Sequence, residues 1–182
     1  MKPLNELKMQ LESRSVNEGY ARTAVSAFIS QLDPTIEELN DIRTSVSEAV
    51  TNCIVHAYKN SCGKIYIDVK IYGDGKTVTK IRDRGRGIED IKKARQPLFT
   101  TLGGDRSGLG FSVMESFSDK VRVTSTLGKG TTVTPYSSRI RSFVIDLKSA
   151  MISQKITIAA TAAYARKVGE KACDSSEFSR SP

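Results

Sequence analysis

The apolar residues of this chain recur with two different periods, which predict an alternation of strands and helices. Leu7, Met9 and Leu11 alternate with polar residues, so they predict an edge strand with one buried face. Apolar residues recur at helical spacing from Tyr20 to Leu32, and no Gly or Pro interrupts the chain from Asp41 to Tyr58. Both of these segments are expected to form helices that pack one face against a sheet.

The remaining elements follow from β-branched runs and glycine-containing turns. We expect strands over residues 64–72, 77–82, 120–125 and 131–134, and short helices over 88–95 and 109–117. The pattern predicts an α+β fold, a two-layer α/β sandwich with helices on one face of a mixed, mostly antiparallel sheet. This domain is expected to span residues 1–134. Residues 135–182 would form a C-terminal extension of unknown role, partly helical or disordered.

The composition is typical of a cytoplasmic globular domain. The 182 residues are 38% hydrophobic, and no apolar run is long enough to span a bilayer. The polar or alternating start of the chain does not read as a signal peptide. The three cysteines, Cys53, Cys62 and Cys173, lack metal-ligand spacing and are expected to be reduced thiols, with Cys53 in the core. We therefore expect a cytoplasmic protein that contacts no membrane.

The net charge of +8 does not by itself predict a nucleic-acid-binding protein. Residues 134–182 hold 8 basic and 4 acidic side chains, so half of the excess lies in the last part of the chain. The main body has no basic stripe with interleaved aromatic residues, and we expect no direct contact with nucleic acid. The local exception is Arg82, Arg84 and Arg86, which could lie beside phosphates or beside an acidic partner.

Two glycine clusters predict a phosphate-binding pocket. Gly85 and Gly87 follow Asp83 at the end of a β-branched run, and Gly108 and Gly110 open a later helix. Glycine lets the backbone approach closely enough to donate N–H groups to phosphate oxygens. A deep Asp83 would accept a hydrogen bond from an exocyclic amine such as that of adenine. The alternative is a hairpin turn at 83–85 and an ordinary surface loop at 103–104.

The long helix carries a carboxylate and a carboxamide one turn apart. Glu48 and Asn52 are four residues apart, so they lie on one side of the helix. Asn supplies a neutral oxygen ligand to Mg²⁺, and Glu can take a proton from an attacking hydroxyl or water. The alternative for such a pair is a solvated helix face.

Other nucleotide-binding classes lack their motifs in this sequence. It contains neither Gly-x4-Gly-Lys-Ser/Thr, which excludes a P-loop, nor the His-Arg-Asp and Asp-Phe-Gly pair of conventional protein kinases. The single histidine, His56, lies one turn beyond Asn52. We expect it to form helix-end hydrogen bonds rather than to accept phosphate.

Several stretches of the chain carry a family resemblance. The most specific are Gln31-Leu32-Asp33-Pro34-Thr35, Ser47-Glu48-Ala49-Val50-Thr51-Asn52 and Ala94-Arg95-Gln96-Pro97-Leu98-Phe99-Thr100-Thr101. The motif order, which ends with Gly128-Lys129-Gly130-Thr131-Thr132, resembles the ATP-binding fold of DNA gyrase, ninety-kilodalton heat-shock chaperones, sensor histidine kinases and mismatch-repair ATPases. Over residues 4–134 the chain resembles the anti-sigma F factors of endospore-forming bacteria, the family of stage II sporulation protein AB.

The resemblance implies a serine kinase that is also an anti-sigma factor. Members of this family form homodimers, bind sigma factor F, and use MgATP to phosphorylate a serine of the anti-anti-sigma factor, stage II sporulation protein AA. By this resemblance Glu48 is the catalytic base, Asn52 binds Mg²⁺ and nucleotide, and Asp83 reads the adenine. Arg22 is the residue that contacts a protein partner. The other residues implied to bind ATP or ADP are Gly85, Gly87, Thr100, Thr101, Arg106, Ser107, Gly108, Leu109, Gly110 and Thr131.

Two other functions remain open on the sequence. The segment Leu102-Gly103-Gly104-Asp105 is shorter and richer in glycine than the family's lid, which leaves room for a nucleotide-gated sigma-binding module without kinase activity. The second is a histidine-kinase-type ATPase fragment, which the lack of a His-bearing hairpin disfavours. The presence of both Glu48 and Asn52 favours the kinase, because a pure binding module needs no base.

Overall fold

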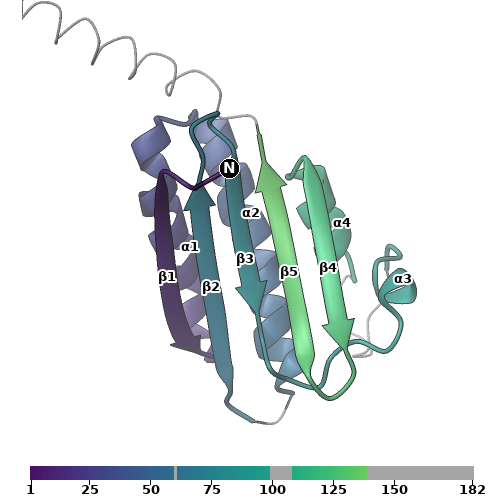
Figure 1. Cartoon of the computed structure of the whole chain (residues 1–182). Coiled ribbons are helices and arrows are strands. Elements are labelled where there is room, and N and C mark those ends of the chain that lie inside the picture. The colour runs from purple at the N-terminus through teal and green to yellow at the C-terminus, as the bar shows by residue number, and fades with distance from the viewer. Residues whose placement is uncertain (60, 99–107, 139–182) are drawn as a thin grey trace, which may run out of the picture. The chain divides into compact units, whose positions relative to one another are not determined.

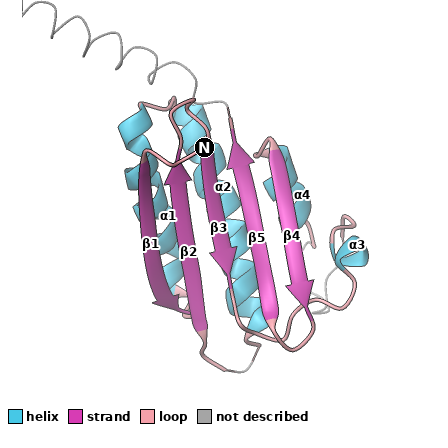
Figure 2. Cartoon of the chain, in the orientation of Figure 1, coloured by secondary structure: helices cyan, strands magenta, loops and turns pink. Residues whose placement is uncertain are grey.

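The computed structural model describes residues 1–59, 61–98 and 108–138, which form a sheet with helices packed on one face. Figure 1 views the sheet from its open face, with α1, α2 and α4 behind the strands, and Figure 2 shows the same two layers by colour. The strands are β1 Asn5–Glu12, β2 Lys64–Ile71, β3 Thr77–Arg82, β4 Lys120–Thr126 and β5 Gly130–Ser137. The α-helices are α1 Val16–Ile29, α2 Ile36–Asn52, α3 Ile91–Ala94 and α4 Gly110–Ser116. The predicted two-layer sandwich is confirmed.

The five strands lie in the order β1-β2-β3-β5-β4, and every described pairing between them is antiparallel. The sheet is therefore antiparallel throughout these strands rather than mixed as expected. The reason is the β4–β5 hairpin, which returns β5 to lie between β3 and β4 and opposite in direction to both. The predicted hairpin between β2 and β3 is present and is closed by the Tyr72 amide, which donates to the Lys76 carbonyl at 2.9 Å.

The core lies between the sheet and its helices. Strand β2 alternates strictly, and its covered face consists of Ile65, Ile67, Val69 and Ile71, each at most 2% exposed. Helix α2 meets this layer with Val46, Ala49 and Val50, which are equally buried. Burying one Val or Ile side chain contributes about 1.5–3 kcal/mol, so this contact fixes α2 on the sheet.

Helix α2 begins with a capping box. The Glu38 amide donates to Thr35 Oγ1 at 3.2 Å, and the Thr35 amide donates to the Glu38 carboxylate at 2.8 Å. At its other end the regular helix stops at Asn52, and the continuation predicted to Tyr58 is a π-helical turn over Cys53–Ala57. The wider turn frees backbone groups at this end of the helix, which the next loop uses.

Helix α3 is shorter than the predicted helix over 88–95. It spans only Ile91–Ala94, with the Asp90 side chain accepting from the Lys93 amide at 3.0 Å. The residues before it are held in a loop because the Ile88 amide donates to Ser125 Oγ at 2.8 Å instead of joining a helix. No helix within the described ranges combines the length and the apolar character needed to cross a membrane. The extension predicted over 135–182 lies outside the described residues from 139 onward.

Candidate functional site

A cavity of about 700 Å³ opens on the helix side of the sheet, between α2, the loop from β3 to α3, the start of α4, and β5. Cavities of this size hold nucleotide-sized ligands. Its walls include two carboxylates, Glu48 from α2 and Asp83 from the residue after β3, and the side-chain amide of Asn52. The sequence motifs thus meet at one place although they lie far apart along the chain.

The Glu48 and Asn52 side chains project from α2 toward the first turn of α4. A Cβ added at Gly110 would lie 2.9 Å from Glu48 Oε2 and 3.5 Å from the Asn52 amide atoms. A side chain at Gly110 would require the Glu48 carboxylate to shift. The glycine therefore lets the backbone that opens α4 come up to the carboxylate and the amide.

Asp83 is 4% exposed and is held by backbone amides. Its Oδ1 atom accepts from the Gly85 amide at 2.9 Å and from the Thr131 amide at 3.1 Å. Its Oδ2 atom lies 3.7 Å from Cys53 Sγ, which donates weakly to it. Burial raises the pKa of Asp83 above its ordinary value, while the hydrogen bonds from Gly85 and Thr131 act against that rise.

Cys53 was expected in the core, and it is 3% exposed, but it also lines the cavity beside Asp83. Burial raises the pKa of the Cys53 thiol well above its ordinary value, and the nearby Asp83 carboxylate adds to the rise. The thiol is therefore neutral at physiological pH and acts as a small hydrogen-bond donor.

The segment from Asp83 to Gly87 is a tight loop bound to the end of α2, so the alternative of a hairpin turn at this place is wrong. The Arg86 amide donates to the Ala57 carbonyl at 3.1 Å, a group that the π-helical turn leaves available. A Cβ at Gly85 would collide with that same carbonyl oxygen. Gly87 has a φ of +75° and sits against the Thr126 carbonyl, so both glycines are required by the backbone geometry.

A hydroxyl pair joins two walls of the cavity. Ser125 Oγ accepts from the Ile88 amide at 2.8 Å and lies 2.9 Å from Thr131 Oγ1. Ser125 Oγ is also 3.1 Å from the Gly130 carbonyl, to which it can donate. Thr131 also donates its backbone amide to the buried Asp83. Ser125 therefore positions both Thr131 and the loop at Ile88.

The predicted site residues divide into three groups. Those that line the cavity are Glu48, Asn52, Asp83, Gly87, Gly108, Leu109, Gly110 and Thr131. Gly85 lies behind the wall, against Ala57. The predicted nucleotide contacts Thr100, Thr101, Arg106 and Ser107 lie outside the described residues.

Arg22 lies elsewhere. It lines a separate cleft of about 320 Å³ between α1 and α2 together with Asn40, Arg43, Thr44 and Ser47. Glu18 connects the two helices there, because its Oε1 atom is 3.5 Å from Arg22 Nε and accepts from Ser47 Oγ at 2.6 Å. Arg22 is thus set apart from the cavity, on another surface of the domain.

Sequence reasoning missed several residues of the cavity. Ile88 and Lys93 line it from the β3–α3 loop and α3, and Ser125 supports it from behind. Arg86 also lines it, and for this residue the sequence did predict a place beside phosphates or an acidic partner. The others have no motif, because their role depends on how the loop folds back against β4 and β5.

Comparison with known proteins places this geometry in a family. A family model described as a histidine kinase-like ATPase domain matches residues 11–135. The anti-sigma F factor of Caldanaerobacter subterraneus subsp. tengcongensis is 54% identical over 140 residues, which cover 75% of this chain and 97% of that protein. The anti-sigma F factor of Priestia megaterium is 50% identical over 131 residues, or 71% of this chain and 89% of that one. This chain belongs to the anti-sigma F factor family of histidine kinase-like ATPase domains.

The fold of this anti-sigma F family member also occurs in solved structures. The structure of the RsbU and RsbW domains of a Mycobacterium tuberculosis protein superposes with a TM-score of 0.55 at 20% identity, covering 74% of this chain and 32% of that one. Membership of the histidine kinase-like ATPase family implies that the chain binds a nucleotide and makes it part of an ATP-using kinase family.

The oxygen donors in this histidine kinase-like site suit Mg²⁺. Asn52 and Glu48 offer hard oxygen ligands next to the opening of α4. Among the described residues no group of three His, Cys, Asp or Glu side chains gathers as a metal cage. Mg²⁺ is typically held by one or two protein oxygens together with substrate phosphates, so the residues present fit that mode of binding.

Proposed function

We propose that this chain binds MgATP in the cavity, phosphorylates a serine of an anti-anti-sigma factor, and binds sigma factor F as a homodimer in the cytoplasm. The names of its relatives support the sigma-binding part of this proposal. The observation that carries the kinase part is the common cavity of Glu48, Asn52 and Asp83. A carboxylate base, an oxygen ligand for a cation and a deep acceptor for a base amine then face one bound nucleotide.

Asp83 orients the nucleotide. Its Oδ1 atom accepts from two backbone amides, whereas Oδ2 accepts only the weak hydrogen bond from Cys53 Sγ, so an exocyclic amine donates to Oδ2. The Thr131 hydroxyl lies beside it, held by Ser125. The fixed carboxylate selects a base that presents a donor, as adenine does, and disfavours one that presents a carbonyl.

Glu48 and Asn52 act at the other end of the nucleotide. Glu48 takes the proton from the incoming serine hydroxyl, and Asn52 holds Mg²⁺ through its carbonyl oxygen. Bound MgATP supplies the electrophilic phosphoryl group, with its charge partly neutralised by the cation. Positioning and charge stabilisation provide most of the catalysis of phosphoryl transfer, so a base, a cation ligand and the amides at the start of α4 are sufficient.

Arg22 contacts the protein partners in this proposal. Its cleft between α1 and α2 is separate from the nucleotide cavity, but Ser47 in the cleft is the neighbour of Glu48 in α2. A partner seated at Arg22 therefore lies against the same helix that carries the base.

The decisive experiment incubates the full chain with labelled ATP, Mg²⁺ and a candidate anti-anti-sigma protein, beside a Glu48→Gln variant. Label on a serine of the partner that is lost in the variant supports the kinase. Glu48→Gln keeps the size of the side chain and removes its basicity, so unchanged ATP binding in the variant is the matched control. Sigma factor binding without transfer of label would instead leave a nucleotide-gated binding module, and label retained on His56 would indicate a histidine-kinase-type fragment.

A further inference from the structure

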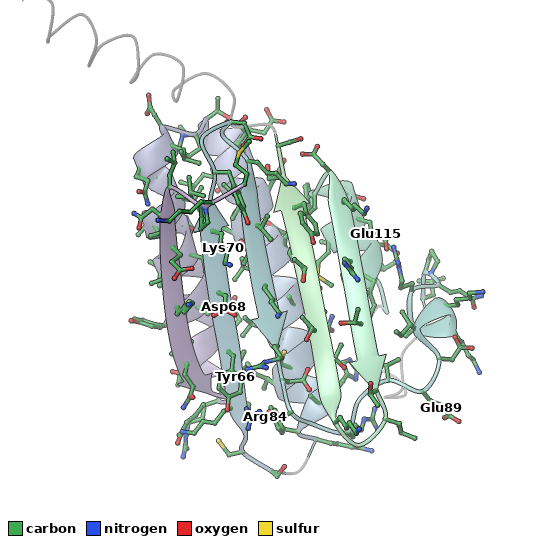
Figure 3. The ribbon with its side chains drawn as sticks, viewed as in Figure 1. Tyr66, Asp68, Lys70, Arg84, Glu89 and Glu115 are labelled. Atoms are coloured by element: carbon green, nitrogen blue, oxygen red, sulfur yellow. The ribbon has the colours of Figure 1, made fainter. Side chains whose placement is uncertain are left out.

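The open face of the sheet carries a group of cations that the nucleotide site does not use. The alternation of each strand places Lys80 and Arg82 of β3 and Lys120 and Arg122 of β4 on this face, and Arg84 follows β3 at its end. These five residues are called the basic sheet face. Figures 1 and 3 view this face, with helices α1 and α2 on the far side of the strands.

The register of the strands brings these cations onto one surface. Arg82 lies opposite Thr132 of β5, and Arg122 lies opposite Thr134 of the same strand. Lys120 lies opposite Tyr136. The residues of β3, β5 and β4 that face this way include no carboxylate, so the cations are separated only by neutral side chains.

These cations differ from the lysines of β1 and of the start of β2, which form ion pairs. Lys8 pairs with Glu6 at 3.1 Å, and Lys64 of β2 pairs with Glu12 at 3.4 Å. None of the five cations of the basic sheet face forms an ion pair within the described residues, although Asp68 of β2 lies opposite Lys80. Uncompensated like charges on a folded surface repel one another, and an anionic partner relieves that repulsion.

Two guanidinium groups on this face are held in place by one ring. The Arg82 and Arg84 guanidinium carbons lie 4.7 and 5.1 Å from the centre of the Tyr66 ring, and Figure 3 shows Tyr66 and Arg84 together at the lower end of the sheet. The Arg84 amide also donates to the Tyr58 hydroxyl at 2.8 Å, which fixes its backbone. Guanidinium groups ordered in this way lose less entropy when they bind carboxylates bidentately.

Charge and ring contacts exclude several candidate binding partners of the basic sheet face. A second copy of the same face would bring like charges together. Residues 139–182 carry 8 basic and 4 acidic side chains, so this segment is also a poor match. Nucleic acid would gain from free aromatic rings, but Tyr66 contacts two arginines and Tyr136 lies 5.4 Å from Lys76, so neither ring is a free stacking platform.

We propose that the basic sheet face docks an acidic segment of a protein partner, with Arg82 and Arg84 binding its carboxylates. The sequence left open whether Arg82, Arg84 and Arg86 lie beside phosphates or an acidic partner. The structure divides the three, with Arg86 lining the nucleotide cavity and the other two on the opposite face of the sheet. The docking surface is separate from both the cavity and the Arg22 cleft, and it does not depend on the proposed kinase activity.

The test measures binding of a fluorescein-labelled peptide of repeating Glu-Ser units to the full chain by fluorescence anisotropy, without nucleotide. A peptide with Gln in place of Glu and a labelled oligothymidylate are the comparison probes. The Arg82→Lys, Arg84→Lys double variant keeps the charge and removes both forks, so we expect its affinity for the Glu peptide to fall about tenfold. Lys8→Gln is the control, because it removes a cation of β1 that is paired with Glu6 and lies outside the basic sheet face. It should change that affinity by less than about twofold.

Three results would overturn the proposal. The first is equal binding of the Glu and Gln peptides by the unmodified chain. The second is unchanged affinity for the Glu peptide in a double variant that unfolds at the same temperature as the unmodified chain. The third is tighter binding of the oligothymidylate than of the Glu peptide by the unmodified chain, with the oligothymidylate binding lost in the double variant. That result would assign this face to nucleic acid.

Discussion

Asp83 is a buried carboxylate. It accepts hydrogen bonds from the Gly85 and Thr131 amides, which act against the rise in its pKa that burial causes. Its pKa is raised, with burial as the largest cause, so the folded protein holds a proton at pH values where the unfolded chain has lost it. The resulting contribution to the free energy of unfolding is fully present below the ordinary aspartate pKa of about 3.9. It is lost as the pH rises through the higher pKa of the folded state.

We therefore expect the free energy of unfolding of the unmodified chain, minus that of Asp83→Asn, to fall as the pH rises through this window. Urea unfolding of both proteins at stepped pH measures the difference, because groups common to both cancel. A difference that stays flat would show that the hydrogen bonds cancel the effect of burial at this carboxyl, and one that increases with pH would show that they outweigh it.

Ser125 has no motif, yet its hydroxyl links the Ile88 amide to Thr131. Ser125→Ala leaves a partly buried amide without its acceptor, which costs about 1–3 kcal/mol. We expect a lower unfolding midpoint in urea and weaker ATP binding by calorimetry, because Thr131 loses its support. Thr124→Ala is the control, since the neighbouring side chain is exposed on the other face of β4, and it should change stability by less than about 0.5 kcal/mol. Equal effects from the two substitutions would argue against a positioning role for Ser125.

At the scale of the element, the start of α4 is set by its contact with α2. Gly110 has ordinary backbone geometry, so alanine is tolerated by the helix, but the new Cβ would press on Glu48 Oε2 and the Asn52 amide. We expect Gly110→Ala to lower the rate of phosphoryl transfer at least about tenfold while the chain stays folded, because the base is displaced from its position.

Gly19 of α1 provides the matched control for this substitution. A Cβ at Gly19 meets nothing within 4 Å, so Gly19→Ala should leave transfer unchanged and stabilise the helix by up to about 1 kcal/mol. Transfer rates and unfolding midpoints measured for the two variants separate an effect on Glu48 from a general effect of alanine. A Gly110→Ala variant with the full rate of transfer would contradict the placement of Glu48 as the base.

At the scale of the whole molecule, the proposed nucleotide site between α2, α4 and the sheet is built from elements distant in the chain. Binding to the folded state alone stabilises it by about 2.7 kcal/mol at a ligand concentration a hundred times its dissociation constant. We expect MgATP to raise the thermal unfolding midpoint of the unmodified chain and to raise that of Asp83→Asn much less, since the variant loses the acceptor for the base amine. Differential scanning fluorimetry measures both shifts. Equal shifts would place the nucleotide away from Asp83.

Much of the fold was predictable from the sequence because its signals are local. The strand predicted over 64–72 and the glycine-containing turn after it depend on neighbouring residues, and both are present in the structure. The pairing of Glu48 with Asn52 on one helix side is equally local, because four residues make about one helical turn.

The sequence by itself determined the elements, the family and the residue types that gather around the cavity at Asp83. Only the tertiary structure decided that α2 ends in a π-helical turn, that Ser125 supports Thr131, and that Arg86 parts from Arg82 and Arg84. The physical reason is that these features depend on strand register and on loop contacts between distant segments. Such contacts leave no periodic trace along the chain, whereas burial of a strand or helix face does.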